Sequence, residues 1–159
     1  MEIERKFVLR SFARKFRRMA RTRLLVEQRY FDGFRIRKMG GDHFITVKKG
    51  SGLVRQEWEK QIPQWAFNIL KKTDARGIVL KTRYFIPFKK HTLEVDVYRG
   101  TLVPLITLEC EFENTKDARA FRMPAIVGEY KEMTGKKELK NRSLAKNGLP
   151  RSIREYYRK

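Results

Sequence analysis

The chain has 159 residues, a length typical of one domain with one hydrophobic core. Apolar residues make up 41% of it, which excludes global disorder, and the formal net charge is +20. So basic a chain attracts polyanions: nucleic acid, an anionic membrane surface, polyphosphate or a nucleotide. Charge alone does not choose among these partners, and it does not indicate the fold.

Cysteine and histidine usage narrows the chemistry. The single cysteine, Cys110, excludes an intramolecular disulfide and favours a cytoplasmic location. His43 and His91 stand alone without zinc-ligand spacing, so a metal site would have to use carboxylate oxygen. No apolar run approaches the roughly 20 residues that cross a bilayer, and residues 2–7 resemble a folded strand rather than a signal peptide.

Most of the chain alternates with the two-residue period of strands. In chain order, this pattern predicts strands at Glu2–Leu9, Leu24–Tyr30, Phe34–Lys38, His43–Lys48, Val54–Ile62, Ile78–Ile86, Thr92–Tyr98 and Leu105–Phe112. Glycine-rich turns at residues 40–42 and 50–52 predict two hairpins.

Helical spacing is confined to a few short segments. It predicts helices at Ile62–Lys72 and Thr115–Phe121, another within residues 129–146, and a basic helical tail at Ser152–Lys159. Residues 11–23 combine apolar residues at helical spacing with six arginines and lysines, which indicates a basic amphipathic helix or a basic loop. The whole chain, 1–159, is predicted to be one domain, with 11–23 as a basic insertion and about 150–159 as a basic tail.

Charged side chains alternate with apolar ones on nearly every predicted strand. An ordinary antiparallel sheet with one solvated face would also alternate. Here, however, the signs are sorted into acidic and basic pairs. The acidic pairs are Glu2/Glu4, Glu94/Asp96 and Glu109/Glu111, and the basic pairs are Arg35/Arg37 and Lys81/Arg83.

Such sorting suits a polyphosphate bridged by metal ions. Converging carboxylates bind hard divalent cations, and converging arginines and lysines bind phosphate oxygens. About eight strands can also close into a barrel wide enough for one small ligand. The predicted fold is therefore α+β and mainly β: a closed eight-stranded antiparallel β-barrel, or tunnel, with a few peripheral helices.

At these residues the sequence resembles the CYTH superfamily of triphosphate tunnel metalloenzymes. Residues 2–6 match its N-terminal Glu-x-Glu-x-Lys motif. The segments 34–37, 44–48, 55–59, 81–84, 93–98 and 108–112 resemble its later strands in the same order, so the likeness runs from residue 2 to about 145.

The resemblance implies a role for each motif residue. Metal ligands would be Glu2, Glu4, Asp96, Glu109 and Glu111, holding two Mg²⁺ or Mn²⁺ ions. Substrate-binding residues would be Lys6, Arg35, Arg37, Lys48, Arg55, Lys81, Arg83 and Lys137. Glu57 and Glu59 would line the same interior. Lys137 belongs to residues 136–141, which depart from the family's usual Asp-x-Arg-Tyr-x-Asn stretch and keep only Asn141 firmly.

The expected activity is metal-dependent hydrolysis of a phosphoanhydride bond in inorganic triphosphate or a related organic triphosphate. Catalysis would use Asp96 with a second cation to orient water, and Lys6 or Lys81 to stabilise the leaving phosphate. One alternative is a class IV-type adenylate cyclase, although no base-recognition motif is evident. The other is a non-catalytic polyphosphate or nucleic-acid binding protein, with polyanion contacts through residues 11–23 and 151–159.

Overall fold

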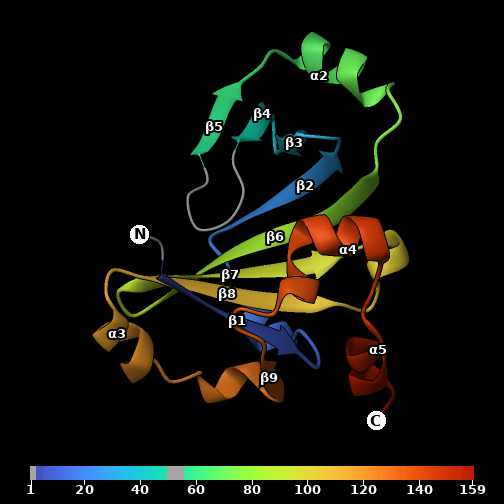
Figure 1. Cartoon of the computed structure of the whole chain (residues 1–159). Helices are drawn as coiled ribbons and strands as arrows, with labels where there is room; N and C mark the ends of the chain where they lie inside the picture. Colours follow the sequence, from blue (N-terminus) through green and yellow to red (C-terminus); the bar gives the residue numbers. More distant parts are fainter. Residues whose placement is uncertain (1–2, 50–55) are drawn as a thin grey trace.

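The computed structural model describes residues 3–49 and 56–159. Within them, nine strands form one antiparallel sheet in the order β5-β4-β3-β2-β6-β7-β8-β1-β9 (Figure 1). The strands are β1 (Ile3–Leu9), β2 (Thr22–Tyr30), β3 (Phe34–Met39), β4 (Asp42–Lys49), β5 (Gln56–Gln61), β6 (Gly77–Phe88), β7 (His91–Tyr98), β8 (Ile106–Phe112) and β9 (Tyr130–Glu132). All eight predicted strands are present within the described residues, and β9 is an unpredicted addition. The predicted turn at residues 50–52 and the first residues of two predicted strands, Glu2, Val54 and Arg55, lie outside the described residues.

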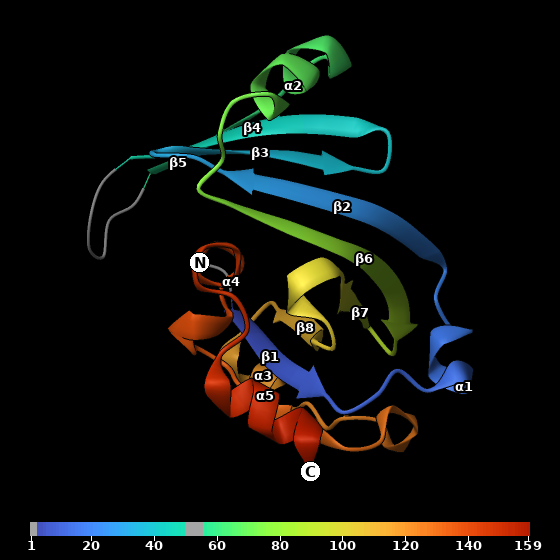
Figure 2. The ribbon, with the colours of Figure 1, turned by 90° about the vertical axis from the view of Figure 1, so that its right-hand side faces the viewer.

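The sheet curls strongly from β4 through β6 and β8 to β1, as Figure 2 shows. The predicted antiparallel tunnel is present as this strongly curled sheet, which hydrogen bonds do not close in the described part of the chain. At the edge of β1, β9 takes the position beside Phe7, Val8 and Leu9. The backbone N–H of Met133 then donates to the carbonyl of Lys6 at 2.8 Å. This edge is therefore occupied, and β5 does not pair with it.

The helices are short and lie around the sheet. They are α1 (Arg14–Arg17), α2 (Gln64–Lys71), α3 (Thr115–Ala120), α4 (Asn141–Asn147) and α5 (Arg151–Arg158), with 3-10 turns η1 (Gly100–Leu102), η2 (Ala125–Val127) and η3 (Lys137–Leu139). Each predicted helical segment therefore contains a helix. None of the described helices is long and apolar enough to cross a membrane.

The outer face of the curl is covered where it is most apolar. Phe7, Leu108 and Cys110 of this face pack in one cluster with Phe12 and Phe16, which flank and occupy α1. The basic stretch 11–23 therefore attaches through buried phenylalanines and leaves its cations exposed. At the other end of the sheet, beside β3, α2 packs Phe67 against Ile36 and Phe31.

A third apolar cluster fills one end of the concave face. Tyr98 and Val8 of the sheet pack there with Leu139, Leu144 and Ile153, from η3, α4 and α5. The α4 helix is also fixed by a polar contact, in which the hydroxyl of Tyr98 donates to Asn141 Oδ1 at 2.7 Å. This end of the curl is thereby filled by the C-terminal third of the chain.

Candidate active site

The strand register places the sorted charges on one surface. Residues directly opposite in an antiparallel pair share a face of the sheet. Lys6 lies opposite Glu109, Glu109 opposite Glu94, and Glu4 opposite Glu111. The same rule continues through Asp96, opposite Arg83, and across β2 to the arginines of β3.

The concave face of the curl therefore carries nearly every predicted site residue that the structure describes. Both signs occur on it in similar numbers. Glu2 and Arg55 lie outside the described residues. Lys48 lies opposite Glu57 in the register of β4 and β5, and its side chain is outside the description.

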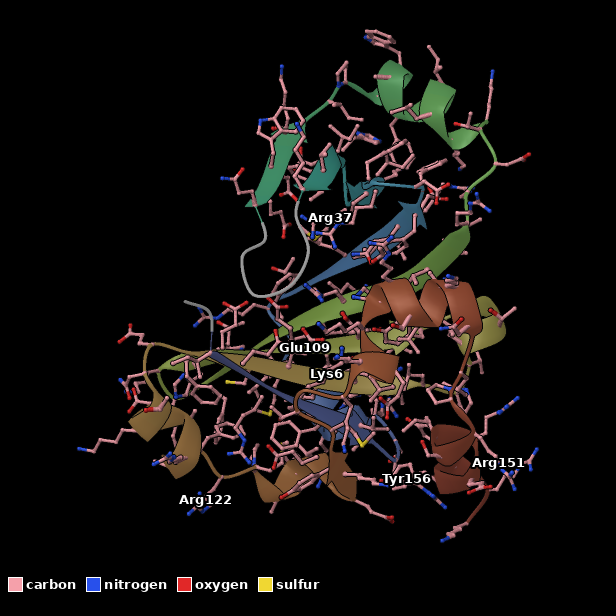
Figure 3. All side chains as sticks on the ribbon, in the orientation of Figure 1. Lys6, Arg37, Glu109, Arg122, Arg151 and Tyr156 are labelled. Carbon is pink, nitrogen blue, oxygen red and sulfur yellow. The ribbon has the colours of Figure 1, made fainter. Side chains whose placement is uncertain are left out.

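A cavity of about 420 Å³ lies on this face. Its polar lining includes Glu4, Lys6, Arg35 and Glu109 from the strands. Cavities of this size suit small ligands. Figure 3 shows Lys6 and Glu109 close together beside the C-terminal segment that crosses the curl.

Three further residues line this cavity: Lys140, Asn141 and Arg142. Asn141 is the residue that matches the family's motif, whereas Lys140 and Arg142 were not identified from the sequence. They begin α4, whereas the predicted ligand Lys137 is exposed in η3. The three residues lie between Leu139 and Leu144, which are buried in the cluster that holds this turn against the sheet.

The two arginines of β3 have loose ion pairs. Arg35 Nη2 lies 3.7 Å from Glu57 and 3.8 Å from Glu59, and Arg37 Nη2 lies 3.4 Å from Glu59. The Nε atoms of both arginines are buried without a hydrogen-bond acceptor among the described residues. Burial also lowers the pKa of Arg37, an effect that Glu59 opposes. Buried donors without acceptors are costly, so an added anion would be stabilised here.

Asp96 forms the tightest ionic cluster. Lys81 Nζ donates to its Oδ2 at 2.7 Å, and Arg83 donates to both oxygens at 2.8 and 2.9 Å. Burial opposes ionisation, but Lys81 and Arg83 hold the pKa of Asp96 well below its usual range. The Asp96 side chain is 1% exposed and that of Lys81 is 0% exposed.

This cluster bears on the predicted roles of Asp96. Its oxygens already accept from two cations, so a metal ion there would have to displace one of them. Metal ligation and catalysis by Asp96, and catalysis by Lys81, stay predictions.

A second group of carboxylates lies toward the β6–β7 turn. Glu94, Glu109 and Glu111 line a cavity of about 390 Å³ together with Glu113 and Asp117. Burial, reinforced by Asp96 and Glu109 and opposed by Arg83, raises the pKa of Glu94. Among the described residues, no group of three or more aspartate, glutamate, histidine or cysteine side chains is arranged so that it could hold a metal ion. Instead, Glu109 pairs with Lys6 at 2.7 Å and Glu94 pairs with Arg83 at 2.8 Å.

Comparison with known proteins decides the family. The model of the CYTH domain matches residues 1–142. The chain belongs to the CYTH domain family.

Two relatives of this CYTH chain carry the name inorganic triphosphatase. The one from Nitrosomonas europaea is 40% identical over 112 residues, which cover 70% of this chain and 73% of that protein. The one from Acetivibrio thermocellus is 32% identical over 153 residues, covering 92% and 94%.

Comparison with solved structures agrees with this family assignment. The crystal structure of an inorganic triphosphatase superimposes with a TM-score of 0.73 at 32% identity, covering 94% of this chain and 97% of that one. A protein from Pyrococcus horikoshii superimposes at 21% identity with a TM-score of 0.51, covering 75% and 84%, which shows the fold alone. The CYTH fold predicted from the motifs is therefore confirmed.

Proposed function

We propose that this CYTH protein is a triphosphatase that hydrolyses a phosphoanhydride bond of inorganic triphosphate on its concave face. The main support is the cavity of about 420 Å³ that places Lys6 and Arg35 beside Glu4 and Glu109. A ligand there needs several negative charges, and it needs to tolerate nearby carboxylates. The two relatives named inorganic triphosphatase support the same substrate.

In this proposal, Arg35 and Arg37 bind phosphate oxygens. Their present contacts with Glu57 and Glu59 are longer than a good charge-assisted hydrogen bond of about 2.7–2.9 Å. A phosphate would also supply an acceptor for the buried Nε atoms. Lys6 Nζ, held by Glu109 and by the carbonyl of Leu139 at 3.0 Å, is placed to stabilise a leaving phosphate.

Lys81 and Arg83 play a supporting part. Arg83 pairs with both Asp96 and Glu94, so its guanidinium is held in one orientation toward the concave face. Asp96 supplies the fixed negative charge that keeps Lys81 and Arg83 together. We propose this orienting role beside the predicted catalytic role of Asp96.

The carboxylates fit a divalent cation by their chemistry. Glu4 and Glu111 are opposite each other in the register, and so are Glu94 and Glu109. Burial raises the pKa of Glu94, with smaller contributions from the like charges of Asp96 and Glu109, and a cation would favour the charged form. Glu4, Glu109 and Glu111, with Glu2 outside the described residues and Glu94 as a further candidate, would hold Mg²⁺ or Mn²⁺, which prefer oxygen ligands. Such an ion neutralises phosphate charge and acidifies bound water.

The test is phosphate release from tripolyphosphate with magnesium or manganese. Arg35→Gln, which changes a residue that lines the cavity, should lower kcat/KM by about ten- to a hundredfold, the worth of one charge-assisted hydrogen bond. The matched control is Lys72→Gln, an exposed residue at the end of α2 that lines neither cavity. Cyclic AMP formed from ATP, with no phosphate released from tripolyphosphate, would instead support a cyclase.

We further propose that the exposed cations of residues 11–23 and 151–159 contact polyanions. No acidic residue occurs between Glu4 and Glu27. Arg14, Lys15 and Arg18 are exposed, and the described residues offer them no ion pair. Replacing all three with glutamine should weaken binding to long polyphosphate and flatten its salt dependence, while tripolyphosphate hydrolysis is retained.

A further inference from the structure

A second cavity adjoins the one proposed to bind triphosphate. It has a volume of about 300 Å³ and lies between the end of β2, the start of β6 and the α4 helix. The two cavities share Tyr30, Phe31 and Arg142. Arg142 therefore stands at the boundary between them, and a chain leaving the first cavity on this side would enter the second.

The second cavity is cationic. Its charged lining residues are Arg76, Arg142, Lys146 and one acid, Asp32. Asp32 already pairs with Arg76 at 2.9 Å. Arg142 and Lys146 lie one turn apart on α4, where like charges repel each other. Among the described residues, neither of them forms an ion pair with a carboxylate. An anionic ligand would relieve this repulsion.

The position of these cations is fixed by close packing. Gly77 lies so near α4 that a Cβ atom there would be 2.3 Å from the carbonyl oxygen of Ala145. Leu144, on the same helix, is 1% exposed. The contact of Tyr98 with Asn141 holds the first turn of the helix. Arg142 and Lys146 thus extend from an anchored helix rather than from a loose loop.

We propose that this cavity is an extension subsite for linear polyphosphates, holding the phosphates that follow the three on the concave face. This proposal rests on the proposed triphosphatase function. A phosphate chain fits the lining better than a nucleoside. Phe31 already stacks on Phe34 at 4.7 Å with an interplanar angle of 8°, and the hydroxyl of Tyr30 donates to Gln28. The aromatic groups are thus engaged, and the groups left for a ligand are cations.

The test compares substrates of different chain length in Arg76→Gln, Lys146→Gln and the double variant. Both residues are exposed and lie outside the first cavity. For tetraphosphate and longer linear chains, each single variant should raise KM about two- to fivefold, the worth of a surface ion pair. The double variant should raise KM about tenfold, and the effect should shrink at high salt. For tripolyphosphate, kcat and KM should stay unchanged.

Controls separate this subsite from general electrostatics. Lys146→Arg keeps the charge and should behave like wild type, and Lys72→Gln removes a charge from α2 away from the cavity and should change neither substrate. Equal losses on tripolyphosphate and on longer chains, or no loss on either, would overturn the subsite. So would a loss confined to nucleoside triphosphates.

Calorimetric binding of the same chains gives a readout that does not need turnover. A wild type that fails to hydrolyse tripolyphosphate would refute the proposed function. The subsite would then be judged by binding alone: it stands if the double variant loses affinity for longer chains only, and it falls if affinity is unchanged.

Discussion

The buried ion cluster at Asp96 gives the sharpest stability prediction. Asp96→Asn removes a charge whose side chain is 1% exposed and whose two partners, Lys81 and Arg83, donate to it at 2.7–2.9 Å. Arg83 keeps Glu94, but Lys81 is left fully buried and uncompensated. Removing one partner of a buried pair costs about 3–5 kcal/mol. We expect a loss of that size in the free energy of unfolding.

The assay is urea-induced unfolding followed by circular dichroism. Glu94→Gln is the matched control, since it removes the other carboxylate of Arg83 from a site where the side chain is 28% exposed rather than 1%; it should cost under about 1 kcal/mol. A double variant, Lys81→Met with Asp96→Leu, should recover much of the loss because no buried charge remains unpaired. An Asp96→Asn protein within about 1 kcal/mol of wild type would refute the reasoning.

The same cluster sets an acid limit on stability. The folded-state pKa of Asp96 is depressed by Lys81 and Arg83, below an unfolded-state value of about 3.9. Its contribution is therefore complete above that unfolded value and declines as pH falls toward the folded-state pKa. Wild type should lose stability steeply below about pH 4, and Asp96→Asn should show a shallower acid dependence.

Three further predictions concern the C-terminal segment and the metal. Gly77→Ala should cost about 1–3 kcal/mol in urea unfolding, because its Cβ would collide with backbone of α4; an unchanged midpoint would contradict this packing. Tyr157→Phe should lower the free energy of unfolding by about 1–3 kcal/mol, since the Tyr157 hydroxyl donates to the carbonyl of Leu9 and accepts from the N–H of Ile106. Chelation by EDTA should abolish phosphate release, and added manganese should restore it; full activity in EDTA would exclude the proposed metal.

The sheet could be predicted from the sequence because the alternation of apolar and charged residues has a physical cause. Each strand that buries its outer face has to present charged residues on the other, so period two shows both the strand and its lining. Cys110 illustrates this: it lies between Glu109 and Glu111, so the two-residue period places it on the opposite face, and it is buried in the cluster on the outer face.

Three features of the structure could not be predicted from the local sequence. The β9 strand has only three residues, too few for a period, and it pairs with one end of β1. The partners of Asp96 come from β6, which the acidic-pair pattern could not link to β7. Lys140 and Arg142 reach the first cavity because Leu139 and Leu144 anchor their turn, a tertiary contact rather than a sequence signal.

The distribution of charge described above has a kinetic consequence. Acidic and basic residues nearly cancel on the concave face, so the excess of +20 belongs to the exterior. The residues that attract an anionic substrate over a long distance therefore differ from those that bind it on the concave face. Added salt should slow the capture of an anionic substrate while leaving turnover of the captured molecule almost untouched, because only the exterior field is exposed to screening.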